Sequence, residues 1–156
     1  MVIHRSGEDP MKTLLSLAAV TLALVAGPAA AENWHKFSYN STAAYLADVD
    51  SIAVEGDVTS IMVAKVPRTG TASDYHYSVD QFVFRCAARQ VRSILNIGYG
   101  DDGAEMDRFD DSDVPWDDVV RNSYLEFLKN IACDGARSSD STWPSIRAFV
   151  DSGRGS

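Results

Sequence analysis

Two cysteines are the residues of this chain with the clearest chemistry. Cys86 closes an alternating, strand-like run, and Cys133 lies at the end of an amphipathic helical run. In an oxidising compartment, two such thiols bond and hold a helix against a sheet. No His or further Cys lies at metal-binding spacing from either thiol, so no metal and no cofactor are expected there. The pair therefore predicts a structural disulfide.

Three arginines, Arg85, Arg89 and Arg92, cluster around the hairpin that follows the longest strand-like run. Their guanidinium groups are candidates for gripping an acidic ligand or a sulfated glycan through bidentate contacts. The alternative is that they cover the polar face of a sheet and pair with nearby acids, and interspersed surface charge favours that interpretation.

The segment 101–118 holds nine acidic residues and one base, Arg108. Asp107, Asp111 and Asp113 have side chains that suit calcium, but an EF-hand loop needs a central Gly and a terminal Glu that this segment lacks. The sequence therefore favours a solvated acidic loop over a calcium site.

Other catalytic arrangements are missing from the sequence. The G-x-S-x-G and S-x-x-K patterns of serine nucleophiles are absent. His35 and His76 stand beside aromatic residues without a Cys, Ser or acid in a recognisable motif, so we expect them to be ordinary strand or surface residues. Trp34, Tyr75, Tyr77 and Tyr99 are expected to be half-buried sheet residues. The chain is thus not expected to be an enzyme.

A secretory leader precedes these residues. The apolar run 14–25 follows the basic Met11-Lys12 and is too short to span a bilayer as a helix. Small residues at 29–31 supply a cleavage site, so residues 1–31 are predicted to be a signal peptide. Residues 1–10 are unlike a leader's basic start, and they indicate either an extended leader or a true start at Met11.

The expected mature chain, residues 32–156, has the length of one domain. The net charge of −8 argues against nucleic acid as a partner, because phosphate backbones repel an acidic protein. No second long apolar segment follows, and no cysteine that could carry a lipid follows the leader. We therefore expect an exported protein, in the periplasm or outside the cell, without membrane insertion or a lipid anchor.

The elements that position these residues follow from the periodicity of the pattern. Period-two alternation of apolar residues predicts strands. Apolar residues recur at helical spacing from Val120 to Ala132 and predict a helix. Its apolar stripe, which consists of Val120, Tyr124, Leu128 and Ile131, is expected to cover the sheet. Ser123 with Glu126 suggests a capping box, and Gly135 marks the helix end. The predicted strands are 34–39, 43–48, 58–66, 75–86, 90–99 and, more weakly, 104–109. Val91, Leu95, Ile97 and Tyr99 are expected to share one face.

This order of strands followed by a helix predicts an α+β fold, in which one C-terminal helix packs on one face of an antiparallel sheet of about six strands and is tied to it by the disulfide. The domain is predicted to span 32–135. Residues 136–156 are expected to form a polar tail with a possible short helix, whose Trp143, Ile146, Phe149 and Val150 would make a sticky segment if they did not fold back.

Several short motifs occur together in a particular order. Tyr45, Asp48, Ser51, Ile52 and Gly56 form a Y-x-x-D-x-x-S-I-x-x-x-G pattern, and Trp34, Phe84-Arg85-Cys86, Trp116 and Cys133 frame it. This arrangement resembles the bacterial surface-adhesin protein E family over roughly residues 34–133. The resemblance implies a sheet of about six strands, with the C-terminal helix tied to its concave face through Cys86 and Cys133.

The resemblance also implies a function. Surface-adhesin protein E binds host matrix and serum proteins and can form dimers. By resemblance, we expect an exported, non-enzymatic protein that engages another protein, and a homodimer is a possible assembly. The missing lipidation cysteine and the tail after Gly135 depart from the family pattern. They favour an alternative hypothesis, a periplasmic accessory or structural protein of the cell envelope without host contact.

Overall fold

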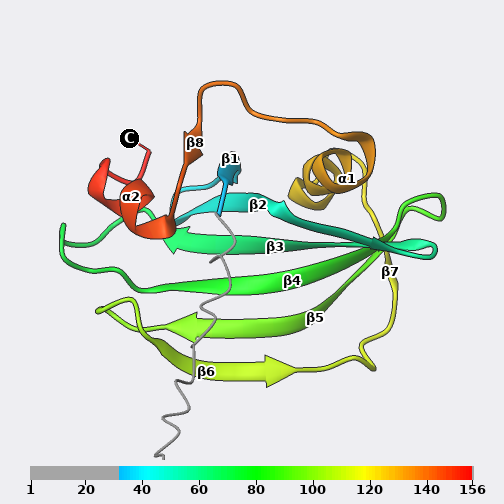
Figure 1. Ribbon diagram of the computed structural model, residues 1–156, viewed down its shortest axis with the longest axis horizontal. Coiled ribbons are helices and arrows are strands. Elements are labelled where there is room, and N and C mark those ends of the chain that lie inside the picture. The colour runs from blue at the N-terminus through cyan, green and yellow to red at the C-terminus, as the bar shows by residue number, and fades with distance from the viewer. Residues whose placement is uncertain (1–31, 156) are drawn as a thin grey trace, which may run out of the picture.

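The protein folds into one antiparallel sheet with two helices, seen in a computed structural model that describes residues 32–155 (Figure 1). The predicted signal peptide lies outside the described residues. The elements are β1 Trp34–Tyr39, β2 Ala43–Glu55, β3 Val58–Pro67, β4 Tyr77–Arg85, β5 Gln90–Tyr99, β6 Glu105–Asp110, β7 Asp117–Asp118, α1 Tyr124–Asp134, β8 Thr142–Trp143 and α2 Ile146–Asp151.

The sheet follows the order β6-β5-β4-β3-β2-β1-β8, and the short β7 pairs with β5. Each of the first six strands lies beside its neighbour in sequence, as expected for strands joined by short turns. The tail then returns across the molecule, so that Trp143 of β8 pairs with Trp34 of β1. The predicted α+β architecture is confirmed, with six longer strands and two strands of two residues.

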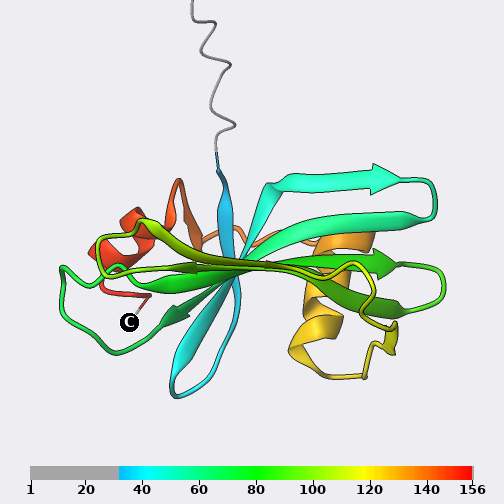
Figure 2. The ribbon, with the colours of Figure 1, turned by 90° about the horizontal axis from the view of Figure 1, so that it is seen from below.

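Two apolar cores form, one on each face of the sheet, because alternate residues of a strand point to opposite faces. On β3, Ala64 and Val66 belong to a core shared with α2, whereas Ile61 and Val63 belong to a core shared with α1. Figures 1 and 2 show the two helices at opposite ends of the sheet. The fold therefore has a second helical layer besides α1, formed by the possible short helix of the predicted tail.

The prediction that Val91, Leu95, Ile97 and Tyr99 of β5 share one face of the sheet is wrong. Val91 packs in the α1 core, whereas Tyr99 packs against the α2 core. A β-bulge causes this, because the pairing with β4 shifts between Ser93 and Leu95 and leaves Ile94 as an extra residue. One extra residue moves every later side chain of the strand to the other face.

The first helix begins and ends where the sequence predicts. The hydroxyl of Ser123 accepts a hydrogen bond from the backbone N–H of Glu126, and Gly135 ends the helix in the left-handed region with φ 75°. The Glu126 carboxylate accepts a hydrogen bond from the backbone N–H of Asn122 at 2.7 Å. In a standard capping box it would accept the N–H of the cap residue itself, Ser123, which is one residue later.

The predicted apolar stripe of α1 is only partly correct. Leu128 and Ile131 are buried, but Tyr124 is 39% exposed and Val120 is 67% exposed. Val119 is buried instead, because its N–H bonds to the carbonyl of Arg89 and so extends the pairing beside β5. Val120 thus lies before the helix and outside its periodicity.

The C-terminal tail folds back onto the sheet. Ser145 caps α2, and Ile146, Phe149 and Val150 are buried in the core on that face. Arg154 is only 6% exposed and donates to the carbonyls of Pro67, Thr71 and Asp74. The apolar residues of the tail are therefore internal and do not form a sticky segment.

Within residues 32–155, neither helix has the length and apolar character needed to cross a membrane.

Candidate functional site

The disulfide between Cys86 and Cys133 is present and has a structural position. The two Cα atoms are 5.8 Å apart, and 47 residues separate the cysteines in sequence. Cys86 directly follows β4 and Cys133 lies in the last turn of α1. Both pack against the α1 core, so the bond fixes the helix on the face that it buries. Sequence reasoning predicted this pair correctly.

The three candidate arginines divide between two places. Arg85 and Arg92 both stack on Trp116, with guanidinium carbons 4.2 and 4.5 Å from the ring centroid. Arg89 instead forms an ion pair with Glu126 at 2.6 Å, which joins the β4–β5 turn to the start of α1. The structure therefore brings Arg85 and Arg92 together without Arg89. A ligand-binding role for the three stays a prediction.

The acidic segment forms a strand that the sequence predicted only weakly. Asp107 lies on β6, whose six residues are all exposed at the edge of the sheet. Asp111 and Asp113 follow in a turn, where the N–H of Asp113 bonds to the Asp111 carboxylate at 3.0 Å. The segment is solvated, as the sequence favoured.

The Y-x-x-D-x-x-S-I motif has a clear local role in β2. The pairing with β3 breaks after Asp48 and resumes at Ala53. Within this break, the Ser51 hydroxyl donates to the Asp48 carbonyl at 2.6 Å and accepts the N–H of Met62 at 2.8 Å. The Asp48 carboxylate accepts the backbone N–H groups of Asn33 and Asp50. Side chains thus satisfy backbone groups that the irregular pairing leaves without strand partners.

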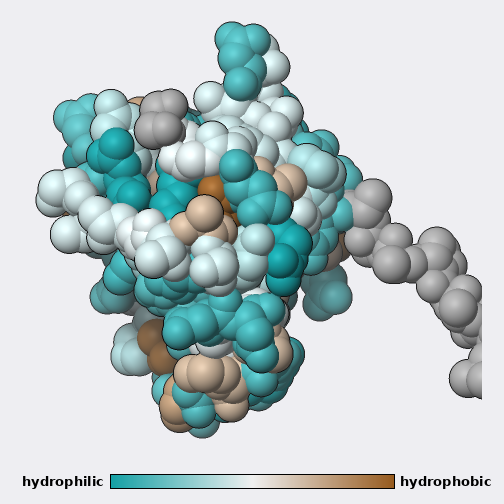
Figure 3. Space-filling model, turned by 90° about the vertical axis from the view of Figure 1, so that its left-hand side faces the viewer, coloured by the Kyte–Doolittle hydropathy of each residue, from teal (hydrophilic) through white to brown (hydrophobic). Residues whose placement is uncertain are grey.

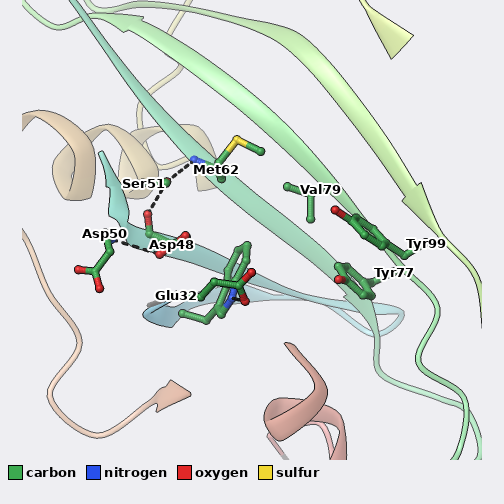
Figure 4. Close-up of a pocket in the computed structure, with 9 residues that line it drawn as sticks. Glu32, Asp48, Asp50, Ser51, Met62, Tyr77, Val79 and Tyr99 are labelled. Carbon is green, nitrogen blue, oxygen red and sulfur yellow. Dashed lines mark hydrogen bonds between the residues drawn. The ribbon is translucent and has the colours of Figure 1, made fainter. Parts of the chain in front are cut away.

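This break opens a pocket of about 270 Å³ on the α2 face of the sheet. We call it the acidic pocket, and Figure 4 shows the residues that line it. Strands β1 to β5 all contribute to it, together with Glu32, which precedes β1. Its lining consists of Glu32, Trp34, Asp48, Asp50, Ser51, Met62, Tyr77, Val79 and Tyr99.

Two stacked tyrosines form one wall of the acidic pocket. The rings of Tyr77 and Tyr99, which face each other across β4 and β5, are 4.3 Å apart and nearly parallel at 6°. Burial, followed by the proximity of Tyr99 and Glu32, raises the pKa of Tyr77 to about 12. Burial also raises the pKa of Tyr99, with Glu105 adding to the effect. Both phenols therefore stay protonated at physiological pH and keep an O–H donor.

Carboxylates form the opposite wall. Glu32 accepts the indole N–H of Trp34 at 2.8 Å, and Figure 4 places it across the pocket from the two tyrosine rings. Asp48 is buried, and Asp50 is exposed at the rim. The lining includes no Lys, Arg or His. Three carboxylates beside aromatic faces attract a cation, since each ring face adds to the attraction of the negative charges.

Sequence reasoning identified parts of this pocket without predicting it. Trp34, Tyr77 and Tyr99 were expected to be half-buried sheet residues; Tyr77 and Tyr99 are partly buried, and Trp34 is fully buried. Asp48 and Ser51 were singled out as members of a motif. No pattern connects residues 32–34 with Tyr99, because their proximity depends on the bulge in β5 and on the break in β2.

Comparison with known protein families gives a match over most of the described chain. The family described as Surface-adhesin protein E matches residues 34–134, which cover both cysteines and most of the sheet. No curated protein and no solved structure matches the chain.

Proposed function

The chain belongs to the surface-adhesin protein E family, and we propose that it is an exported binding protein without catalytic activity, which engages another protein through the acidic pocket. Membership of the family supports a surface-adhesin-like protein. The pocket adds the chemistry of recognition: a basic side chain of the partner enters it.

The observation that carries this proposal is the charge of the lining. Glu32, Asp48 and Asp50 contribute three carboxylates, and no basic side chain lines the pocket to balance them. A Lys or Arg of a partner would supply the missing charge, and its apolar stem would pack on the rings of Tyr77 and Tyr99. The overall charge of −8 favours the same kind of partner, because it attracts a basic surface from a distance.

The size of the pocket is compatible with one side chain. Its volume of about 270 Å³ lies near the lower end of the range of about 300–1,000 Å³ for pockets that bind small molecules. A side chain projecting from a protein surface can enter a pocket of this size.

A non-enzymatic role fits the state of Ser51, the serine in the lining. The Ser51 hydroxyl already donates to the Asp48 carbonyl and accepts the Met62 N–H, so both of its hydrogen-bonding roles serve the backbone. Activation of a serine requires a general base that accepts its proton. Here that proton is held by a carbonyl oxygen, and this arrangement supports binding over acyl-transfer chemistry.

A binding assay with matched variants tests the proposal. We would express the full chain with its leader, purify the exported protein and measure its affinity for immobilised matrix proteins and for proteins extracted from the producer's own envelope. Asp50→Asn and Glu32→Gln remove exposed charges from the pocket and should weaken capture at least about tenfold, as expected for loss of a charge-assisted contact. Asp57→Asn, which removes an exposed charge from the β2–β3 turn, should leave capture unchanged.

Equal binding by Asp50→Asn, Glu32→Gln and the unmodified protein would contradict the role of the pocket. Location is tested separately by treating intact cells with protease. Digestion of the protein on intact cells supports a host-facing adhesin. Protection from digestion, with release on periplasmic extraction, supports the alternative of an envelope accessory protein.

A further inference from the structure

A second cluster of polar side chains lies beside α2, where the β3–β4 connection meets the turn between β5 and β6. Asp74 and His76 belong to the connection between β3 and β4, and Asp101 begins the turn between β5 and β6. Figure 3 looks at this end of the molecule and shows a largely hydrophilic surface. None of the three residues lines the acidic pocket.

The three side chains converge on one point. Their ligand atoms all lie within 4.8 Å of one another. His76 Nδ1 is 2.5 Å from Asp74 Oδ1 and 3.9 Å from Asp101 Oδ1. In a tetrahedral zinc site with bonds of about 2.0 Å, two ligand atoms are about 3.3 Å apart. The two observed separations lie on either side of that value, and all three ligand atoms lie within 4.8 Å of one another, so displacements of up to about 1.5 Å would bring them to such a geometry.

The backbone that carries these ligands is held from two sides. The N–H of Tyr75 bonds to the Asp101 carbonyl at 2.9 Å and joins the two connections directly. The buried Arg154 binds the Asp74 carbonyl, so the tail fixes the first connection as well. Arg147 of α2 stacks on Tyr75 at 3.8 Å and bonds to the Asp102 carbonyl. A ligand set on fixed backbone loses little entropy when an ion binds.

The chemistry of the donors limits the kind of ion. Among residues 32–155, no Lys or Arg side chain forms an ion pair with the carboxylate of Asp74 or Asp101, and His76 is the common neighbour of both carboxylates. Ca²⁺ and Mg²⁺ prefer oxygen ligands alone, whereas an imidazole with carboxylates suits Zn²⁺ and related transition metals. Three protein ligands leave a further position for water or for a donor from outside the chain.

We propose that Asp74, His76 and Asp101 form a binding site for a divalent transition metal, with Zn²⁺ as the best match. The sequence did not indicate this site, because Asp101 is 25 residues beyond His76 and only the pairing of β4 with β5 brings the two connections together. The site is independent of the acidic pocket, and its test does not depend on a protein partner.

Calorimetric titration of zinc tests this site directly. The exported protein would carry no histidine tag and would be freed of metal with a chelator before titration. We expect one equivalent of Zn²⁺ to bind in the micromolar range and to raise the unfolding temperature, because the ion binds the folded state. A millimolar excess of Ca²⁺ should not displace it.

Variants identify the ligands. The Asp101 side chain is 90% exposed, so Asp101→Asn should fold normally and weaken zinc binding at least about tenfold. His76→Gln should have the same effect, whereas Asp102→Asn, which changes the neighbouring exposed acid, should bind zinc as the unmodified protein does. Absence of heat at a large excess of zinc, or unchanged binding by Asp101→Asn, would overturn the proposal.

Discussion

His35 shows how one buried side chain links two distant segments. Its Nδ1 accepts the backbone N–H of Ser138 at 3.1 Å, and its Nε2 contacts the Asn33 side-chain oxygen at 3.1 Å. These contacts require a neutral ring that carries its proton on Nε2. Burial, followed by the charge of Arg137, lowers the pKa of His35 below its usual 6.5, against the smaller opposing effect of Asp50 and Asp48.

This arrangement predicts an acid-sensitive stability. His35 takes up a second ring proton less readily in the folded protein than in the unfolded chain. The free energy of unfolding therefore falls as the pH drops below about 6.5, and this group does not affect it above that value. Urea denaturation at pH 7.5 and pH 5.5 measures the difference. His35→Gln should be less stable at pH 7.5 and should lose less on acidification, whereas His76→Gln should retain the slope that His35 produces. An identical slope in His35→Gln would contradict this role.

Arg154 predicts a larger effect on stability. Its guanidinium donates to the carbonyl of Pro67 at the end of β3, at 2.7 Å, and to the carbonyls of Thr71 and Asp74 in the β3–β4 connection, at 3.3 and 2.5 Å. Arg154→Ala leaves those carbonyls without donors, so we expect a loss of about 3 kcal/mol in the free energy of unfolding. Equilibrium denaturation measures it, with the exposed Arg121→Ala as the control. A loss no larger than that of the control would show that water replaces the guanidinium without cost.

At the scale of elements, the disulfide predicts how strongly α1 is held to the sheet. A cross-link across 47 residues restricts the unfolded chain and contributes about 4 kcal/mol in the chain-entropy treatment. The double variant Cys86→Ala/Cys133→Ala, which leaves no free thiol, should unfold at a correspondingly lower urea concentration. Circular dichroism should still report a folded sheet in the absence of urea. Unchanged stability would mean that the α1 core alone holds the helix.

The strands and helices could be predicted largely from periodicity, but their irregularities could not. Alternation located β1 to β5, and the Ser123 and Gly135 caps located α1. The extra residue at Ile94 leaves no mark in the alternation, since Ser93, Ile94 and Leu95 are all compatible with a strand. Asn122 adopts φ 60°, which separates Val120 from the helix and explains why its apolar spacing was misleading.

The whole molecule depends on its tail more than the family match indicates. The match ends at residue 134, yet α2 and Arg154 complete the second core and hold the β3–β4 connection. From the sequence, the tail was expected to be polar, because its Ser, Asp and Arg residues outnumber the few apolar ones that fold inward. The binding sites were harder to predict, because each joins residues from connections far apart in the chain.

A variant within the tail tests this dependence. Phe149 is completely buried and lies against Trp143 with ring centroids 4.8 Å apart. Phe149→Ala removes its contacts and leaves a cavity, so we expect a loss of about 3–5 kcal/mol in the free energy of unfolding. Phe127→Ala, which truncates an exposed ring on α1, should cost far less. Similar losses in the two variants would contradict the view that the tail completes a core.

Recognition of a basic side chain by the acidic pocket is tested most directly by nuclear magnetic resonance. The exported protein, labelled with ¹⁵N, would be titrated with a blocked Gly-Arg-Gly peptide and with its citrulline counterpart, which keeps the shape and lacks the charge. The indole N–H of Trp34 reports on the pocket through its bond to Glu32, and Trp116, which stacks with Arg85 and Arg92 and does not line the pocket, is the internal control. We expect the arginine peptide, but not the citrulline peptide, to shift the Trp34 signal together with Asp50, Tyr77 and Tyr99. Equal shifts with both peptides, or shifts confined to other residues, would contradict the account.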